Sequence, residues 1–534
     1  MRLPPILRLI AVTTLLRLAF AASTGLGVDE SYMVTSGRVL SLGYFDHPPA
    51  SWWLSWGAAH LFGTEAPWAV RLPFILLFAL SQLLVWRITC LVADRRAGFW
   101  AVLALNLSPV FGVTTGTWVL PDGPLDAALL GAALCLLHAL PADRPRGVGW
   151  RGVGWRGVAW RGMAWRGMAW RRWGWQGWGW RRWGWQGWGW RGWGWRGLGW
   201  WLGAGVCAGL ALFSKYSAVL TIGGAFLYLL TSRPHRHWLT RPEPYIAAIV
   251  AAAVFSPVVI WNATHGWASF AFQGSRAAGL RFRPLLPLQT LAGEALFVLP
   301  WVWVPMMMLL VSGFRRGEVW PRRLLVWLAA PPVVGFALIS AWSSQRVLYH
   351  WAAPGYLMLF PLLGDAAARR LDRVWVRGLF AGTAALVVAS LAVIATQVDF
   401  DWLGGRLGAV MRGDPTAEGL DWTSIGDDLR ARGLLPPGAV VAALNWRDAG
   451  KLGYALGPRT TMLCLNADSR QFGFAHRLSA YAGQNVLVLA VDPPGEASSW
   501  FRSIQGLPAT SVRLDGRTLR TVTVMRGEGL RPPP

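Results

Sequence analysis

Two adjacent carboxylates, Asp29 and Glu30, stand a few residues beyond the first long apolar segment of the chain, residues 4–22. An aspartate with a pKa of about 4 is ionised at neutral pH and can accept a proton from a hydroxyl group late in a reaction. Because Asp29 lies just past an apolar segment, we interpret it as a candidate general base at an interface. The alternative is a cap on a short interfacial helix. Glu30 is expected to be structural or to orient an acceptor.

A third carboxylate, Asp122, occurs in the sequence Pro121-Asp122-Gly123-Pro124, which predicts a turn at the start of another apolar segment. Asp122 either caps that segment or assists a catalytic partner or a sugar hydroxyl. Lys215 is one of only two lysines in a chain with many arginines. In an apolar setting its compact positive charge suits a phosphate group, and snorkelling to the interface is the alternative. Arg276 and Arg346 are weaker candidates for the same task.

Several histidines and aromatic residues accompany these charges. His47, His265 and His350, with Asp46 or Glu30, could hold a divalent cation, but their spacing fits no tight metal motif, and ordinary hydrogen-bonded histidines are favoured. We therefore expect that no cofactor is required and keep a divalent cation as an open alternative. Tyr44 and Tyr349, with Trp52 and Trp53, could stack on a sugar or line a lipid groove, although an aromatic belt at an interface explains them equally.

The elements that position these residues are predicted to be membrane helices. The chain of 534 residues is 54% hydrophobic and 14% charged, whereas soluble proteins carry about 25% charged residues. Apolar stretches of a length that can cross a bilayer recur along the first three quarters. The candidate spans are residues 4–22, 68–93, 98–115, 124–140, 200–213, 217–231, 245–261, 287–311, 324–342, 351–363 and 378–396.

The net charge of +25 follows the membrane topology. The excess of arginine lies in loops of the apolar part, at residues 94–96, 144–196, 233–241, 315–323 and 369–377. This is the positive-inside pattern, and it argues against a nucleic-acid partner. With a cytoplasmic N-terminus, eleven spans place these loops inside and the C-terminal segment outside. Residues 200–231 then form a short hairpin with Lys215 near the outer surface, and the other candidate site residues collect on that same outer face.

Residues 147–201 form a degenerate repeat of tryptophan, arginine and glycine with a period of five. Neither a helix nor a strand gathers residues of that period on one face. A repeat expansion tolerated in a cytoplasmic loop is the favoured interpretation. A belt that binds membrane lipids and an RNA-binding segment remain alternatives.

The chain changes character from about Asp399, where charges become frequent and balanced. Helices predicted over 421–432 and 445–456 alternate with β-like segments 439–444, 461–465 and 485–491, and a final hairpin turns at Asp515-Gly516. We expect a small α/β domain over residues 398–534, after a membrane domain over residues 1–397 with an insert at 144–200. Its polar loop residues are expected to form a solvated surface, with acceptor contact as the alternative; they are Asp448, Lys451, Asp468, Arg470 and Gln471.

An ordered set of motifs in the first half resembles a known family. It comprises Asp29-Glu30-Ser31-Tyr32, Gly43-Tyr44-Phe45-Asp46-His47-Pro48-Pro49, Val70-Arg71-Leu72, Pro121-Asp122-Gly123-Pro124-Leu125 and Leu212-Phe213-Ser214-Lys215-Tyr216. The set is similar to bacterial family-39-type membrane glycosyltransferases, relatives of protein O-mannosyltransferases and of the aminoarabinose transferase that acts on lipid A. The similarity is good over residues 25–232, weaker to about 365 and thin beyond, and the Trp/Arg insert is foreign to the family.

This resemblance implies the GT-C fold. Together with the spans and the tail segments predicted above, it indicates a polytopic α-helical protein of the bacterial inner membrane with about eleven spans and a small C-terminal periplasmic α/β domain. It implies transfer of a sugar from a polyprenyl-phosphate donor, with inversion, to a lipid, glycan or protein acceptor. Asp29 would be the base, with Glu30 and Asp122 beside it. Donor phosphate would bind Lys215, Arg276 and Arg346. The substrate contacts would be Tyr44, Asp46, His47, Tyr349 and His350.

Two other classes remain open. A multi-pass transporter or flippase should carry its charged residues inside the spans near the middle of the membrane, whereas these residues cluster in loops on one side. A membrane-bound RNA- or lipid-binding scaffold built on the Trp/Arg repeat should lose its function when the repeat is deleted.

Overall fold

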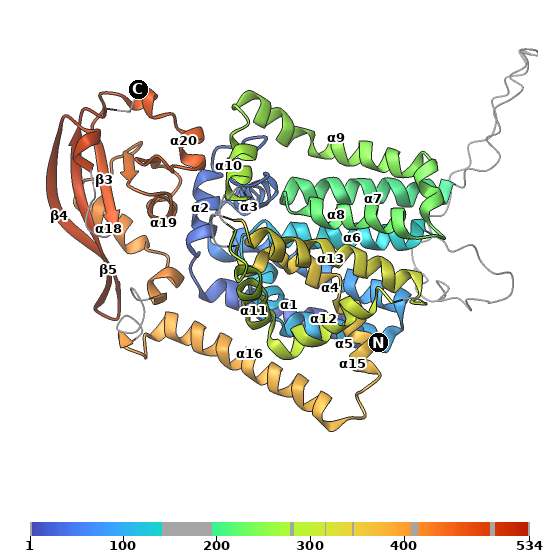
Figure 1. Cartoon of the computed structure of the whole chain (residues 1–534). Coiled ribbons are helices and arrows are strands. Elements are labelled where there is room, and N and C mark those ends of the chain that lie inside the picture. The colour runs from blue at the N-terminus through green and yellow to red at the C-terminus, as the bar shows by residue number, and fades with distance from the viewer. Residues whose placement is uncertain are drawn as a thin grey trace, which may run out of the picture.

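The computed structural model describes residues 3–140, 195–277, 282–315, 317–343, 347–406, 415–491 and 497–531. A bundle of helices forms its larger part, and a smaller domain with a β-sheet covers one end of that bundle (Figure 1). The described N-terminal end of helix α1 lies at the far end of the bundle from the small domain (Figure 1). The Trp/Arg repeat falls almost entirely outside the described residues.

Seven helices in the described ranges are long and apolar enough to cross a membrane. Several begin with proline in the first turn, where no intrahelical hydrogen bond is lost. The seven are α1 (Pro5–Ser23), α4 (Pro67–Val92), α6 (Asp122–Ala139), α7 (Trp195–Ser214), α9 (Glu243–Thr264), α13 (Trp320–Ser340) and α16 (Val374–Phe400).

Seven of the eleven predicted spans correspond to these helices, and the other four apolar segments are short or broken in the described chain. Helices α11 (Leu286–Val298) and α12 (Pro300–Ser312) meet at 118°, where Leu299 has a φ of 83°, and together they make an eighth span at most in the described chain. Helix α8 (Ala218–Thr231) has 14 residues. Helix α5 (Arg95–Leu107) gives way to a π-helix, η1 (Val110–Thr115). The segment 351–363 is divided among η3 (Tyr349–Ala352), α14 (Ala353–Leu357) and α15 (Phe360–Ala368).

Shorter helices form the end of the bundle that faces the small domain. They are α2 (Val28–Ser36), α3 (Ala50–Phe62) and α10 (Ala268–Ala277). The predicted hairpin around Lys215 is present, since α7 ends at Ser214 and α8 begins at Ala218. Helix α16 runs along the edge of the bundle and its C-terminal end reaches the small domain (Figure 1).

The small domain contains one five-stranded mixed sheet in the order β2-β1-β3-β5-β4. Strands β1 (Val440–Ala443), β2 (Thr461–Cys464) and β3 (Val486–Val491) are parallel, and β4 (Ser503–Leu514) and β5 (Arg517–Glu528) add an antiparallel hairpin. Asp515 and Gly516 both have positive φ values, as a tight hairpin turn requires. The three predicted β-like segments match β1, β2 and β3 within a residue at each end, and the predicted hairpin turn lies between β4 and β5.

Helices α18 (Thr423–Ala431) and α19 (Trp446–Leu456) and the short α20 (Gln471–Ala475) complete the domain. Helix α19 packs against α2, and the Gly450 backbone approaches Tyr32 so closely that a Cβ would lie 2.9 Å from its backbone. Apolar side chains of α2 and of the sheet share one core. The small domain is therefore packed onto α2, the helix that carries Asp29 and Glu30.

Candidate active site

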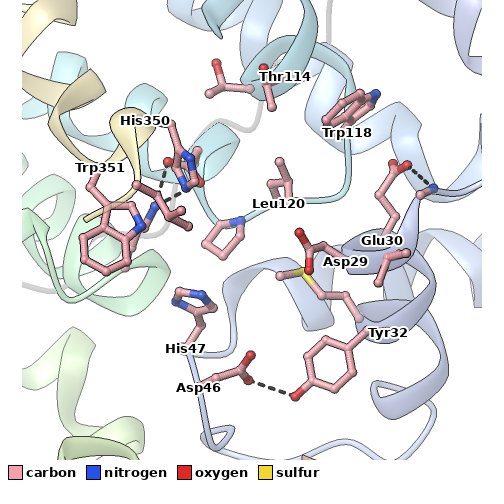
Figure 2. A pocket seen from close by; sticks show the side chains of 18 of the residues that line it. Asp29, Glu30, Tyr32, Asp46, His47, Thr114, Trp118, Leu120, His350 and Trp351 are labelled. Carbon is pink, nitrogen blue, oxygen red and sulfur yellow. Dashed lines mark hydrogen bonds and ion pairs between the residues drawn. The ribbon is translucent and has the colours of Figure 1, made fainter. Parts of the chain in front are cut away.

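A cavity of about 1060 Å³ lies between the helical bundle and the small domain. Residues from α1, α2, α6, α7–α8, η3 and α16 line it, together with residues of the small domain. Figure 2 shows this pocket with its acidic and imidazole side chains drawn as sticks. Seven of the eleven predicted site residues lie in its wall, namely Asp29, Glu30, Asp46, His47, Asp122, Lys215 and His350.

Asp29 lies in the first turn of α2 and is accessible from the cavity (Figure 2). Its carboxylate has no hydrogen bond or ion pair with another described residue. The surrounding protein limits its hydration and raises the pKa of Asp29 above the ordinary value, although the positive charges of Arg470 and Arg447 oppose this rise. Asp29 is not the helix cap, because Gly27 holds that position. An unpaired carboxylate facing a cavity is free to accept a proton.

Glu30 is buried, and its carboxylate accepts four hydrogen bonds. Its carboxylate receives two from the Arg71 guanidinium, at 2.8 and 2.6 Å, and others from the backbone N–H groups of Gly27 and Val119. Arg71 also donates to the carbonyl oxygens of Ala21, Thr24 and Gly25 and to the hydroxyl of Thr24. These contacts tie α2 to α1 and α4. Glu30 therefore acts in the structure as the anchor of the segment that carries Asp29.

Asp122 and Lys215 form a buried ion pair in the cavity wall. Asp122 is the first residue of α6, and Lys215 lies between α7 and α8. The ammonium nitrogen is 2.9 Å from Oδ1 and 3.1 Å from Oδ2 of Asp122. An ammonium group has three N–H donors, so one that contacts a carboxylate can still donate to another anion.

Asp46 joins the bundle to the small domain. Its carboxylate accepts a hydrogen bond from the Tyr32 hydroxyl at 2.9 Å (Figure 2) and lies 3.3 Å from Nη1 of Arg470. Gln273 donates to its backbone carbonyl. Burial raises the pKa of Asp46, and the nearby Arg470 opposes that effect. With its carboxylate engaged on both oxygens, Asp46 is placed to fix Arg470 in the wall.

His47 and His350 enter the cavity from different elements (Figure 2). His265 does not line it, because its ring stacks on Trp261 with centroids 4.4 Å apart. Within the described ranges no group of three or more histidine, cysteine, aspartate or glutamate residues is arranged to hold a metal ion. His47 and His350 therefore contribute polar side chains to the cavity wall near Asp122.

Two predicted site residues, Tyr44 and Tyr349, are described by the structure and do not line the cavity. Tyr44 is fully buried and stacks on Trp52 at a centroid distance of 4.3 Å, so its proposed substrate contact is corrected to a packing role. Tyr349 packs against the backbone of Gly293 and is also outside the lining. Arg346 lies outside the described residues, as does the side chain of Arg276. Among the three predicted phosphate-binding cations, Lys215 is the one that the described part of the chain places in the cavity wall.

The small domain adds residues to the cavity wall, and of these the sequence had singled out Arg470 but not Trp446 or Arg447. Trp446 and Arg447 begin α19, and Arg470 precedes α20. The Arg470 guanidinium lies 3.8 Å from the Trp446 ring centroid, a cation–π contact that fixes its position. The expected solvated surface is thus corrected for Arg470, Gln471 and Lys451, of which the last two are buried. The sequence contains one feature that predicts their position. Asn445 is a residue type that caps helices, so Trp446 and Arg447 are expected in the first turn of the helix that follows.

Comparison with known proteins agrees with this architecture. A family model described as dolichyl-phosphate-mannose-protein mannosyltransferase matches residues 46–160 and 191–261. No curated protein sequence matches the chain significantly. The fold of the chain is that of a GT-C membrane glycosyltransferase, and the resemblance predicted from the sequence is confirmed.

Two solved structures have folds similar to that of the chain. The chain is similar to ArnT from Cupriavidus metallidurans in the apo state, with a TM-score of 0.60 and 16% identity over 97% of both chains. It is also similar to the same protein bound to undecaprenyl phosphate, with a TM-score of 0.57 and 16% identity over 97% of both chains. The match extends through the small domain as well as the bundle.

Proposed function

We propose that the chain transfers a sugar from a polyprenyl-phosphate donor to a nucleophilic group of an acceptor, within the cavity beneath the small domain. The single observation that supports this most is the composition of the cavity wall. It contains an unpaired carboxylate, Asp29, and a separate buried cation, Lys215 beside Asp122. Glycosyl transfer from a phosphate donor needs both, a base for the acceptor and a positive charge for the leaving group.

In the proposed reaction the acceptor oxygen forms a bond to C1 of the sugar while the bond from C1 to the phosphate oxygen breaks. Asp29 takes the proton of the acceptor, and both electrons of the broken bond leave with the phosphate. Lys215 offsets the negative charge that grows on the phosphate, and Asp122 holds the ammonium group in place. A single displacement of this kind inverts the configuration at C1.

The other wall of the cavity suits a lipid carrier. Its apolar residues come from helices of the bundle and from α16; among them are Phe20, Val219, Leu220, Phe336, Ile339, Ile394 and Val398. A polyprenyl chain would bury apolar surface there while its phosphate reaches Lys215. The structure of ArnT with undecaprenyl phosphate supports a ligand of this class.

We place the cavity and the small domain on the periplasmic side of a bacterial inner membrane, with the N-terminus in the cytoplasm. The arginine-rich loops support this orientation, since positively charged loops remain in the cytoplasm. The donor sugar is a hexose or a pentose, and the acceptor is a lipid, a glycan or a protein. The proposed reaction requires no cofactor. The assay tests separately whether a divalent cation contributes.

The experiment is a turnover assay with the purified chain in lipid nanodiscs. Synthetic polyprenyl-phosphate pentoses and hexoses are offered with extracts of envelope lipids, glycans and proteins, with and without a chelator. Mass spectrometry follows the release of free polyprenyl phosphate and the mass added to an acceptor. Release of the carrier together with a sugar-sized mass on one acceptor class supports the proposal. Intact donors with every acceptor would contradict it.

A further inference from the structure

Lys451 is a buried cation of the small domain that the proposed reaction does not use. It lies on α19 and is 2% exposed. Its ammonium nitrogen donates to three backbone carbonyl oxygens, those of Leu26 at 2.7 Å, Glu418 at 3.1 Å and Leu420 at 2.7 Å. It also lies 5.3 Å from the ring centroid of Trp422. A buried ammonium group is costly unless every donor is paired, so this contact set is demanding in geometry.

The three carbonyls belong to two segments that are far apart in the sequence. Leu26 lies in the link between α1 and α2, whereas Glu418 and Leu420 lie at and just beyond the 3-10 helix η4 (Pro415–Gly419). Two further hydrogen bonds connect these segments, from Gly25 N–H to the Gly419 carbonyl at 2.8 Å and from Leu26 N–H to Oδ1 of Asp421 at 3.2 Å. A Cβ on Gly25 would lie 2.6 Å from the carbonyl carbon of Leu420, so the close approach requires glycine there.

A second buried cation holds the same link from the membrane side. Arg71 of α4 binds the carbonyl oxygens of Ala21, Thr24 and Gly25, and Lys451 binds that of the next residue, Leu26. The link from α1 to α2 is thus held between a cation of the bundle and a cation of the small domain. Asp29 follows three residues later, in the first turn of α2.

We propose that Lys451 is a positioning residue of the small domain, which holds the link before α2 and thereby sets where the Asp29 carboxylate lies in the cavity. This inference rests on the proposed function, since it concerns the base of that reaction. The segments that Lys451 connects also form part of the cavity wall. The residues that line it there are Glu418 and Gly419 of the clamped segment and Trp446 and Arg447 at the start of α19. The small domain completes the site from which the base acts.

The protonation of Lys451 agrees with this role. Burial lowers the pKa of Lys451 to about 8, while Glu418, Asp421 and Glu30 favour the charged form and Arg71 opposes it. At neutral pH the side chain therefore remains largely an ammonium group, whose three N–H donors equal the three carbonyl acceptors. Neutral lysine would have two donors for the same three carbonyls.

The test compares Lys451→Met with Arg432→Gln in the full chain. Methionine fills a similar buried space without a donor. Arg432 binds Asp428 and the Pro508 carbonyl inside the small domain, so its loss weakens that domain without touching the link. Hydrogen–deuterium exchange of residues 25–30 and steady-state kinetics are measured on both variants and on the native chain, each normalised to the folded fraction.

Lys451→Met is expected to speed exchange at residues 25–30 and to lower kcat by about 10- to 100-fold, with the KM for the donor changed less than about twofold. Arg432→Gln should leave both readouts as in the native chain. Unchanged exchange, or faster exchange with native kcat, would overturn the positioning role. An equal loss of kcat in Arg432→Gln would also overturn it, since any weakening of the domain would then suffice. Absence of transfer by the native chain would instead refute the proposed function, while the exchange comparison still reports on the clamp.

Discussion

The ammonium nitrogen of Lys215 lies within 3.1 Å of both carboxylate oxygens of Asp122, and both side chains are buried in the cavity wall. The two residues are 93 positions apart in the sequence. Because the pair is buried, its members depend on each other for stability. In the proposed reaction the ammonium group binds the donor phosphate while it stays beside Asp122.

The Lys215–Asp122 pair gives a prediction that separates stability from donor binding. Lys215→Met leaves the Asp122 carboxylate buried and unpaired, which should cost about 3–5 kcal/mol of stability. Adding Asp122→Asn removes the uncompensated charge and should restore much of the thermal stability. Binding of polyprenyl phosphate should remain lost in both variants, because neither has the cation. Recovery of binding in the double variant would show that Lys215 does not hold the phosphate.

Asp29→Asn should reduce turnover by about 100- to 10,000-fold, the range expected when a general base is removed. Since the Asp29 carboxylate makes no hydrogen bond to another described residue, the thermal unfolding midpoint should stay within a degree or two of the native value. Asp427→Asn, an exposed carboxylate of α18 paired with Arg430, is the matched control and should keep native turnover. Native turnover by Asp29→Asn would remove this residue as the base.

The pH profile should report the environment of Asp29. The carboxylate acts as a base only when ionised, so activity falls as the pH drops through its pKa, which burial raises above the ordinary value. Arg447 lowers that pKa, and its loss in Arg447→Gln should move the acid limb of kcat to higher pH. Arg459→Gln removes an exposed arginine beyond the other end of α19 and should leave the limb in place. A shift to lower pH in Arg447→Gln would contradict the assignment.

Glu30 should behave as an anchor. Glu30→Gln weakens the ion pair with Arg71 and leaves that guanidinium buried without a charged partner, which should cost about 3–5 kcal/mol. We expect a lower yield of folded chain and a lower unfolding midpoint in detergent. Turnover per folded molecule should fall far less than in Asp29→Asn. If the folded Glu30→Gln chain were as inactive as Asp29→Asn, Glu30 would have a chemical role.

The Trp/Arg repeat should be dispensable for transfer. The family model matches up to residue 160 and resumes at 191, so the middle of the repeat interrupts an otherwise familiar sequence. Replacing residues 147–190 by a short Gly/Ser linker should leave kcat and KM within about twofold of native, because the residues that the proposed reaction uses lie elsewhere in the chain. Loss of activity with normal folding would favour the scaffold interpretation.

Three cavity residues that could be predicted, Asp29, Asp122 and Lys215, share one property. Each is a charged residue at the end of an apolar segment. Such positions are unfavourable without a purpose, so they are visible in a sequence. Tyr44 was misjudged because an aromatic residue near an interface has the same pattern whether it faces a cavity or stacks on Trp52. Its direction depends on packing between helices, which no local pattern contains.

In the small domain, too, local features could be predicted from the sequence and tertiary contacts could not. Its strands and the Asp515-Gly516 turn follow from local patterns, and they match the structure closely. Lys451 was expected on a solvated surface. Its burial could not be predicted, because it depends on contact with Leu26, which is more than four hundred residues away in the sequence. The continuity of four predicted spans could not be predicted for a related reason. Hydropathy recognises apolar segments, but the bend at Leu299 and the division of residues 351–363 depend on prolines and tertiary packing.

The central claim, transfer of a sugar by Asp29-dependent chemistry, is tested most directly in membranes of cells that express the native chain or Asp29→Asn at equal abundance. Mass spectrometry compares their envelope lipids, glycans and outer-face proteins. We predict that one acceptor class carries a hexose- or pentose-sized addition only with the native chain. Identical profiles that both carry the addition would contradict Asp29 as the base. Profiles that both lack it, with the lipid carriers unchanged, would contradict sugar transfer and favour a transporter.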